Sequence, residues 1–184
     1  GCEAGNERIL KSINKGISLQ QVKTAVDWTN QAGIKNAVNF IIGHAGETYE
    51  DALESLKFAA SLPTNFVNFY NLVPYPGTEA FTWARKNAKF LYPQESFLKR
   101  ISYRDNVPIY ETKEFTKEER QAVIKKGFAL YEKKAMQFRL GDTLGAVAFL
   151  FTRIPLIHNL AINSVVGNQL GRKLFMLLSS KSRE

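Results

Sequence analysis

Over its first 87 residues the chain alternates between helix-like and strand-like hydrophobic patterns. Apolar residues recur at helical spacing in residues 7–13, 18–33 and 48–62, and each stretch opens near a residue that can cap a helix. Between the last two helices, Ala37–Ile42 forms a nearly continuous apolar run, and residues 65–73 form another strand-like run. We expect the first of these strands to be buried on both faces, as in a parallel sheet.

These alternating patterns predict three strand–helix units. The stretch GCEAG at the start of the chain reads as the end of a strand, and a short helix over residues 78–86 follows the last strand. Such repetition is typical of an α/β fold with a parallel sheet, either a barrel or an open doubly wound sheet. In both architectures ligands bind at the carboxyl ends of the strands, where the turns after Cys2, Ile42 and Val73 lie.

The second half of the chain has a different character. Residues 88–114 lack a clean period, and we expect them to form an irregular connector between residues 1–87 and a helical region, 115–184. Thr116 and Glu119 have the spacing of a capping box, which predicts a helix to about Leu140.

Residues 143–178 contain apolar stretches that are too short or too polar to span a bilayer. Helices that pack on the core or on a partner are the first interpretation of these stretches. An interfacial amphipathic helix that docks on anionic lipid is the second.

Charge is distributed unevenly within the net total of +8. Residues 1–84 carry six Lys and Arg against eight Asp and Glu, whereas residues 85–184 carry nineteen against nine. The resulting net charges of −2 and +10 favour an acidic partner or an anionic surface for the second half. The basic residues are dispersed among acids without an aromatic platform, so nucleic acid is not the favoured partner.

Cysteine use and the chain start give two further expectations. The single cysteine, Cys2, cannot form an internal disulfide and cannot by itself hold an iron–sulfur cluster, so we expect a small buried strand residue. No secretory leader pattern is visible, which indicates a cytoplasmic location. The chain opens in mid-pattern, and we interpret it as a fragment.

The turn after Ile42 is the most suggestive local feature. Gly43 and Gly46 remove side chains where a strand ends, which lets a ligand approach the backbone. On local evidence alone, a capped connection between strand and helix is the better interpretation. His44 has no visible partner and is expected to be a bystander, while Glu47 has no assigned role.

Three segments taken together change this interpretation. GCEAGNERILKSINKG, NFIIGHAGETYED and NLVPYPGTEAF, in this order, resemble the second half of a radical S-adenosylmethionine (SAM) barrel. The variant with an associated cobalamin-binding domain, which includes anaerobic magnesium-protoporphyrin ester cyclases and several methyltransferases, is the most similar. The resemblance covers residues 1–87 and implies a partial (β/α) barrel of parallel strands followed by an α-helical C-terminal region.

The resemblance also implies a set of cofactor-binding residues. Glu3 would make polar contacts with the ribose and amino-acid portion of SAM. Ile41 and Gly43 would lie beside the adenine, and Leu72 and Val73 would lie near it. No catalytic residue and no metal ligand is assigned. The usual Ser and Pro of the family are replaced in this chain by Ala4 and Ala45, which weakens a ribose contact at the first position and softens the turn at the second.

The implied function is that of an enzyme of which this chain is one part. The [4Fe–4S] cluster would be bound by a cysteine loop outside this chain, and cobalamin by a domain outside it. The complete enzyme would cleave SAM reductively and act on an unknown apolar or tetrapyrrole substrate. The chain alone would be inactive.

Three alternatives stay open. An RNA-modifying radical SAM enzyme is one. Another is a non-catalytic half-barrel remnant that docks on a partner or a membrane through residues 115–184. The basic, apolar C-terminal region also suits peripheral contact of an active enzyme with the inner face of the membrane.

Overall fold

The computed structural model describes residues 1–94, 96–100 and 106–154. By internal contacts the chain divides into two compact units, Gly1–Tyr131 and Glu132–Glu184. In this division residues 88–131 belong to the first unit. The domain boundaries expected from the sequence stay a prediction. In chain order the first elements are α1 (Glu7–Ser12), α2 (Leu19–Gln31), β1 (Ala37–Ile42), α3 (Tyr49–Ser61), β2 (Phe66–Asn71) and α4 (Glu79–Asn87). They are followed by β3 (Lys89–Phe90), η1 (Phe97–Arg100), β4 (Tyr110–Glu111), α5 (Lys117–Leu140) and α6 (Asp142–Thr152).

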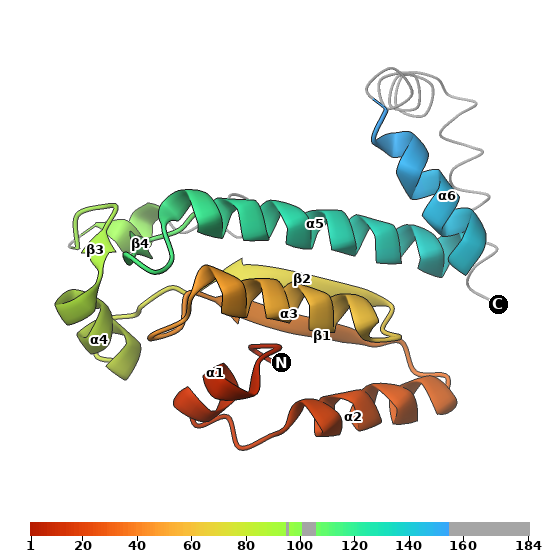
Figure 1. The fold of residues 1–184 in the computed structure, drawn as a ribbon, viewed down its shortest axis with the longest axis horizontal. Helices are drawn as coiled ribbons and strands as arrows, with labels where there is room; N and C mark the ends of the chain where they lie inside the picture. The colour runs from red at the N-terminus through yellow and green to blue at the C-terminus, as the bar shows by residue number, and fades with distance from the viewer. Residues whose placement is uncertain (95, 101–105, 155–184) are drawn as a thin grey trace. The chain divides into compact units, whose positions relative to one another are not determined.

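A small parallel sheet organises the first unit (Figure 1). Strands β1 and β2 pair in parallel, with Phe40 opposite Phe69, and α3 connects them. On the other side of β1, Glu3 forms a parallel bridge with Phe40, so a third chain segment runs in the same direction. The predicted strand–helix units and their parallel direction are therefore confirmed. Closure of these strands into a barrel stays a prediction.

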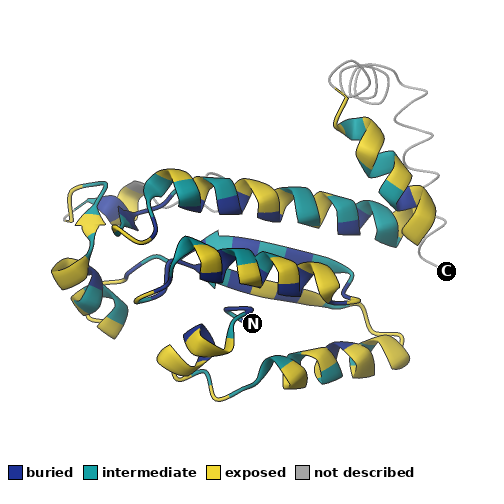
Figure 2. Ribbon diagram, viewed as in Figure 1, coloured by how far each residue is buried: buried dark blue, intermediate teal, exposed yellow. Residues whose placement is uncertain are grey.

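One face of this sheet carries the core. Phe40 stacks on Phe69 with ring centroids 4.8 Å apart, and its edge meets Phe58 of α3 at 6.4 Å. Such aromatic pairs contribute about 0.5–1.5 kcal/mol each beyond the burial of their area. Gly127 lets α5 approach the same face, since a Cβ there would lie 2.8 Å from the Phe69 Cβ. In Figure 2 the buried residues gather on the strands and on the sides of α3 and α5 that face them.

The opposite face of the sheet is not buried, so the expectation of a strand buried on both faces is wrong. Burial alternates along β1, where Ala37 and Asn39 are exposed. At one end of this face Phe66 of β2 contacts Tyr131 of α5, with ring centroids 5.9 Å apart. The side chain of Asn39 accepts a hydrogen bond of 2.8 Å from Asn68, its register partner on β2. This bond satisfies one polar atom of each amide on the open face.

The capping box expected at Thr116 and Glu119 forms, and two more begin helices earlier in the chain. Ser18 and Gln21 begin α2, Thr48 and Asp51 begin α3, and Thr116 and Glu119 begin α5. Each pairs a hydroxyl with one backbone N–H and returns an acceptor to another, which satisfies donors that a helix start leaves free. Helix α5 then ends at Leu140, as its periodicity predicts.

Helix α2 packs more loosely than its pattern indicates. Val26 is its one buried residue, while Ala25 is exposed. An open cavity of about 440 Å³ lies between the inner side of α2 and the sheet near Cys2 and Val38. Cys2 itself is buried in the core, as expected.

Residues 88–114 hold more regular structure than expected, since β3 and β4 pair in antiparallel fashion. Around this pair lies a second core, which we call the aromatic cluster, formed by Leu72, Val73, Phe81, Trp83, Ala84, Phe90, Tyr92, Phe97, Ile109 and Tyr110. Asn106 closes the outer edge of β2 nearby. It accepts from the Asn71 N–H at 2.8 Å and donates to the Phe69 carbonyl at 2.7 Å, as a neighbouring strand would.

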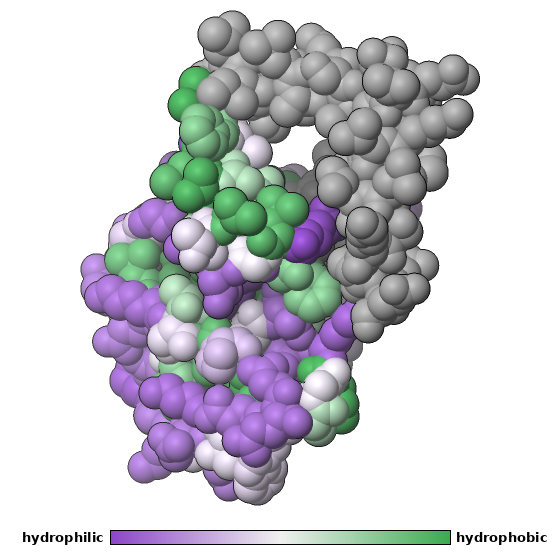
Figure 3. All heavy atoms as spheres, turned by 90° about the vertical axis from the view of Figure 1, so that its right-hand side faces the viewer, coloured by the Kyte–Doolittle hydropathy of each residue, from purple (hydrophilic) through white to green (hydrophobic). Residues whose placement is uncertain are grey.

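The second unit is described for residues 132–154. Gly145 of α6 lies against the end of α5, where a Cβ would come 2.6 Å from the Met136 carbonyl carbon. The large exposed hydrophobic residues of this unit are Leu140, Leu144, Val147, Leu150, Phe151 and Ile154. Figure 3 shows this hydrophobic surface on α6.

Two expectations concern the membrane and the end of the chain. Among the helices of the described residues, none combines the length and the apolar character needed to cross a bilayer. Expectations for residues 155–184, including His158, fall outside the described part of the chain.

The close approach of α5 to the sheet yields a first prediction. Replacing Gly127 by Ala should lower the free energy of unfolding by up to about 2 kcal/mol, because a collision with the backbone-near Phe69 atoms that costs up to about 3 kcal/mol outweighs the roughly 1 kcal/mol gain in helix propensity. Gln121→Ala, at an exposed position of the same helix, is the control and should change little. Thermal unfolding followed by circular dichroism measures both. A Gly127→Ala protein as stable as the wild type would contradict this packing.

Candidate functional site

Three chain segments end side by side at the carboxyl edge of the sheet. The Ile41 N–H donates to the Glu3 carbonyl at 2.8 Å, and the Leu72 N–H donates to the Ile42 carbonyl at 2.8 Å. The structure thereby brings the sequence-predicted residues Glu3, Ile41 and Leu72 onto adjacent strand ends. Val73 follows directly, and both Leu72 and Val73 pack against the aromatic cluster.

Glu3 occupies an unusual backbone conformation. Its φ of 72° lies in the left-handed region, which a residue with a Cβ adopts at a cost of roughly 1–2 kcal/mol. Its neighbours Cys2 and Ala4 are buried, while its own carboxylate is partly accessible and receives Lys15 Nζ at 3.0 Å. Strain of this kind at a strand end is the type of observation that points to function.

The turn after β1 is organised by a carboxylate that the sequence left unassigned. Glu47 Oε2 accepts the backbone N–H groups of both Gly43 and His44, the latter at 2.9 Å. On the opposite side of the same peptide, the Tyr110 hydroxyl donates to the Gly43 carbonyl. Both polar groups of Gly43 are therefore bound within the protein.

Arg120 is the residue that sequence reasoning missed. Its side chain enters from α5 and is 1% exposed. The guanidinium carbon lies 4.4 Å from the ring centre of Tyr110 and 5.0 Å from that of Phe115, and Nε donates to the Phe115 carbonyl at 3.4 Å. A signal was present, because position 120 shares a helix face with Val123 and Gly127 and so places a charge on the apolar stripe.

Gly43 is required by this arginine as well as by its own backbone. Its φ is 97°, and a Cβ at this position would collide with Arg120 Nη1 and lie 2.9 Å from Cζ. The sequence predicted that this glycine lets a ligand approach. The structure gives a protein-internal reason for it, and the contact of Gly43 with adenine stays a prediction.

Burial dominates the electrostatics behind the turn. It raises the pKa of Glu47 to about 7, against the pull of the His44 and Gly43 N–H groups and the positive charge of Arg120. Burial likewise lowers the pKa of Arg120, which Tyr110 and Glu47 partly offset, and raises that of Tyr110. One oxygen of Glu47 and Nη1 of Arg120 have no hydrogen-bond partner among the described residues.

His44 lies buried at the same edge, and its expected role as a bystander stays a prediction. Its ring is 7% exposed, and burial lowers its pKa while the Glu3 carboxylate and the Glu3 and Ile41 carbonyls act in the opposite direction. Within the described chain, Nε2 of the ring has no hydrogen-bond partner. An imidazole with a lowered pKa therefore lies beside Glu3 and Ile41, two residues that the sequence assigned to the site.

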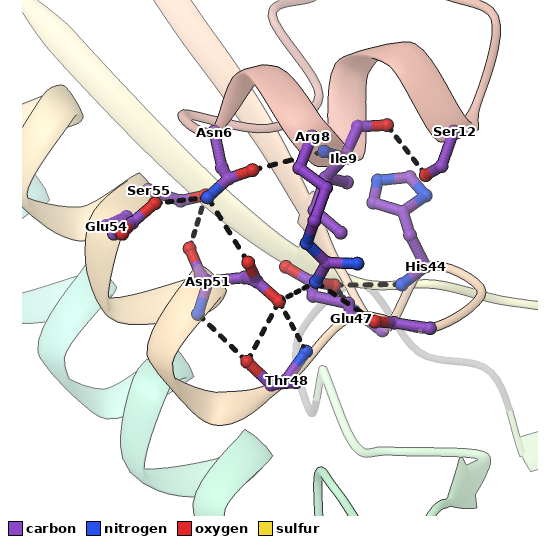
Figure 4. Close-up of polar contacts among 12 residues, drawn as sticks. Asn6, Arg8, Ile9, Ser12, His44, Glu47, Thr48, Asp51, Glu54 and Ser55 are labelled. Atoms are coloured by element: carbon purple, nitrogen blue, oxygen red, sulfur yellow. Dashed lines mark hydrogen bonds and ion pairs between the residues drawn. The ribbon is translucent and has the colours of Figure 1, made fainter.

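A polar clamp fixes the far side of the turn to α1 (Figure 4). Arg8 forms an ion pair with Asp51 and donates to the Gly46 carbonyl at 3.1 Å. Asn6 donates to the second Asp51 oxygen at 3.2 Å. Burial alone would raise the pKa of Asp51, but hydrogen bonds from the Thr48 N–H and from Arg8 hold it below its ordinary value.

The donor set does not fit an iron–sulfur cluster. Burial and the neighbouring Glu3 charge raise the pKa of Cys2 to about 11, and its thiol donates to the Ala4 carbonyl at 3.0 Å. The sequence holds no second cysteine, and no cluster of three His, Cys, Asp or Glu exists among the described residues. The arrangement suits binding: a carboxylate at one strand end beside partly exposed apolar residues at the next two.

Comparisons with known proteins show what the chain is similar to. Residues 1–59 match the model of the radical SAM superfamily. An uncharacterized methyltransferase of Pyrococcus horikoshii is 32% identical over 128 residues, which make up 70% of this chain and 27% of that protein. An anaerobic magnesium-protoporphyrin IX monomethyl ester cyclase of Rubrivivax gelatinosus is 30% identical over 81 residues, 44% of this chain and 15% of that protein.

A third relative acts on RNA by its name. A tRNA-2-methylthio-N(6)-dimethylallyladenosine synthase of Sulfurihydrogenibium sp. is 30% identical over 80 residues, 42% of this chain and 18% of that protein. In all three comparisons the chain spans about a quarter or less of the relative's length.

The buried Glu47 yields a prediction about pH. Because its pKa is higher in the folded state than its ordinary 4.5, its contribution to stability is complete below about pH 4.5 and is lost as pH rises through about 7. The loss is at most about 3 kcal/mol, from the size of the shift. Glu47→Gln keeps an acceptor for the Gly43 N–H and should flatten this part of the stability profile.

Urea unfolding of both proteins from pH 4 to 8 measures the effect. Arg120 and Asp51 act on Glu47 through their charges and His44 through its backbone N–H, and all three are present in both proteins. The difference between the two profiles therefore isolates Glu47. A constant difference across this range would show that folding does not shift the pKa of Glu47.

Proposed function

The chain belongs to the radical SAM superfamily, and we propose that it supplies one wall of the SAM site in a longer radical SAM enzyme. The observation that carries this proposal is the alignment of Glu3, Ile41 and Leu72 on adjacent parallel strand ends, joined by backbone hydrogen bonds. Ligands of parallel α/β folds bind at this edge. The superfamily match to residues 1–59 covers the first two of these three ends.

The residues at this edge suit different parts of SAM. The Glu3 carboxylate is partly accessible and can accept hydrogen bonds from the ribose hydroxyls or the amino group. Ile41, Leu72 and Val73 are half-buried and offer an apolar surface to the adenine ring. The Lys15–Glu3 ion pair limits the freedom of the carboxylate before the ligand arrives.

This chain's contribution is binding, orientation and exclusion of water. In radical SAM enzymes as a class, reductive cleavage of SAM at a [4Fe–4S] cluster is chemistry of the cofactors. The cluster ligands would lie outside this chain, as would a cobalamin-binding domain. The open face of the sheet, with Asn39, Asn68 and Tyr70, would form part of the substrate wall. We propose an apolar or tetrapyrrole small molecule as substrate, because a related protein is named a magnesium-protoporphyrin ester cyclase.

A modified RNA is the second candidate substrate. The relative from Sulfurihydrogenibium sp. carries a name that specifies a tRNA product, and the second half of this chain is basic. Transfer RNA added to the reconstituted enzyme distinguishes the two candidates. Binding that weakens steeply with salt, together with label transfer from SAM to tRNA, would favour this second candidate.

The reaction itself gives a direct test. The longer protein, purified and reconstituted with iron and sulfide under anaerobic conditions, should release 5′-deoxyadenosine from SAM when a reductant is added. Liquid chromatography with mass detection measures this product. An intact cluster without SAM cleavage would contradict the enzymatic proposal and favour a half-barrel remnant that only docks on partners.

The role of Glu3 gives a residue-level prediction. In the same reconstituted protein, Glu3→Gln should raise the Kd for SAM by on the order of tenfold to a hundredfold, the effect of losing a hydrogen bond to a charged group. Lys15→Met is the matched control, because it removes the ion-pair partner and leaves the carboxylate. Equilibrium dialysis with labelled SAM measures both. Equal losses in the two variants would assign Glu3 to the ion pair alone.

We also propose peripheral contact of the second unit with an anionic membrane, on the cytoplasmic side. Residues 132–184 carry eight Lys and Arg against three Asp and Glu, and α6 exposes Leu144 and Leu150. A basic segment with an exposed apolar helix binds such a surface through both its charge and its buried area.

Sedimentation with lipid vesicles checks this contact. The protein should pellet with vesicles that contain phosphatidylglycerol and far less with pure phosphatidylcholine. Leu150→Ser should reduce the bound fraction, whereas Trp28→Ser, at an exposed apolar position of the first unit, should not. Equal recovery with both kinds of vesicle would contradict electrostatic docking.

A further inference from the structure

We propose that Arg120 is a positioning residue, inserted by α5 behind the β1 turn, that holds the backbone of Gly43 and His44 in the conformation that faces SAM. The inference rests on the proposed function for the ligand, but its geometry stands independently of it. Arg120 lies 73 positions after the turn's last residue, Glu47, so α5 contributes to an edge that the superfamily match does not reach.

The guanidinium is itself held rigidly. It lies over the faces of Tyr110 and Phe115, at 4.4 Å and 5.0 Å from the two ring centres, and Nε is bound to the Phe115 carbonyl. Stacking on two rings suits the flat, delocalised guanidinium and does not suit a lysine ammonium. A side chain fixed in this way can define the position of whatever packs against it.

The glycine against which it packs is held from three directions. Glu47 accepts the Gly43 N–H from within the turn, Tyr110 of β4 donates to the Gly43 carbonyl, and Arg120 occupies the space where a Cβ would stand. The Gly43–His44 peptide, held in this way, also positions the neighbouring residues Ile41 and His44.

The charge of Arg120 requires an explanation that packing alone does not give. Burying a guanidinium costs several kcal/mol unless opposite charge lies near it. Glu47 is the buried carboxylate whose charge acts on Arg120, and both groups converge on the Gly43 turn. An apolar side chain could fill the same space without this cost. The arginine adds an electrostatic hold on Glu47, and through Glu47 on the two backbone N–H groups.

Variants in the reconstituted longer protein test this role. Arg120→Met keeps the length and removes the charge, Arg120→Lys keeps the charge and loses the stacking, and Tyr110→Phe removes only the hydroxyl. Lys125→Met, at an exposed site on the same helix, is the control. Hydrogen exchange of the peptide that contains Gly43 and His44 reports on the turn, and equilibrium dialysis reports on the Kd for SAM.

We expect Arg120→Met to speed exchange of this peptide and to raise the Kd for SAM by on the order of tenfold to a hundredfold, because small displacements of positioning groups have effects of this size. Tyr110→Phe should shift both readouts in the same direction by a smaller amount. Arg120→Lys, which keeps the charge but loses the stacking, should give values between those of the wild type and of Arg120→Met. The control should match the wild type in both readouts.

Unchanged exchange in both Arg120→Met and Tyr110→Phe would overturn the proposal, as would faster exchange with an unchanged Kd for SAM. If Arg120→Met fails to fold, Tyr110→Phe and Arg120→Lys still decide the outcome. A wild-type protein that does not bind SAM would refute the proposed function. A wild type that binds SAM, but no more tightly than the Arg120 variants do, would refute only the positioning role of Arg120.

Discussion

A carboxylate buried behind a strand end constrains the whole carboxyl edge of this sheet. Glu47 is buried away from water. The free-energy cost of removing its carboxylate from water is partly offset by the Gly43 and His44 N–H groups and by the positive charge of Arg120. Because these partners come from the turn and from α5, the turn cannot change conformation without exposing an uncompensated charge or orphaned donors. The edge that is proposed to meet SAM is therefore shaped from behind by the side chains of Glu47 and Arg120.

The same network explains why the region after β2 belongs to the first unit. Tyr110 belongs to the aromatic cluster, which also contains Leu72 and Val73, and its hydroxyl reaches the Gly43 carbonyl. The strand end of β2, the turn of β1 and the start of α5 thus share one set of contacts. A segment without a hydrophobic period in the sequence becomes the link between the sheet and its C-terminal helix.

Local rules predicted the elements well because they act over three or four residues. The capping pairs Thr48–Asp51 and Thr116–Glu119, and the apolar run of β1, depend only on neighbours along the chain. The expectation of burial on both faces of β1 failed because it depends on what covers Asn39, which lies beyond any local pattern. Asn106 and Arg120 were missed for the same reason: one closes a strand edge 35 residues away, and the other reaches a turn more than 70 residues away.

At the candidate site, the sequence predicted which residues lie at the strand ends, and the structure adds the contacts that hold those residues in place. Glu3, Ile41, Gly43, Leu72 and Val73 were chosen by resemblance, and the sheet places them on neighbouring ends, but no local pattern gives Glu3 its left-handed backbone. A strained backbone persists only where several surrounding contacts fix it. Glu3 is fixed by its bridge to Phe40, by the buried Cys2 and Ala4 on either side, and by its ion pair with Lys15. In the proposed SAM site, a carboxylate whose backbone is fixed in this way would lose little entropy when the ligand binds, so preorganisation would be this chain's contribution to binding.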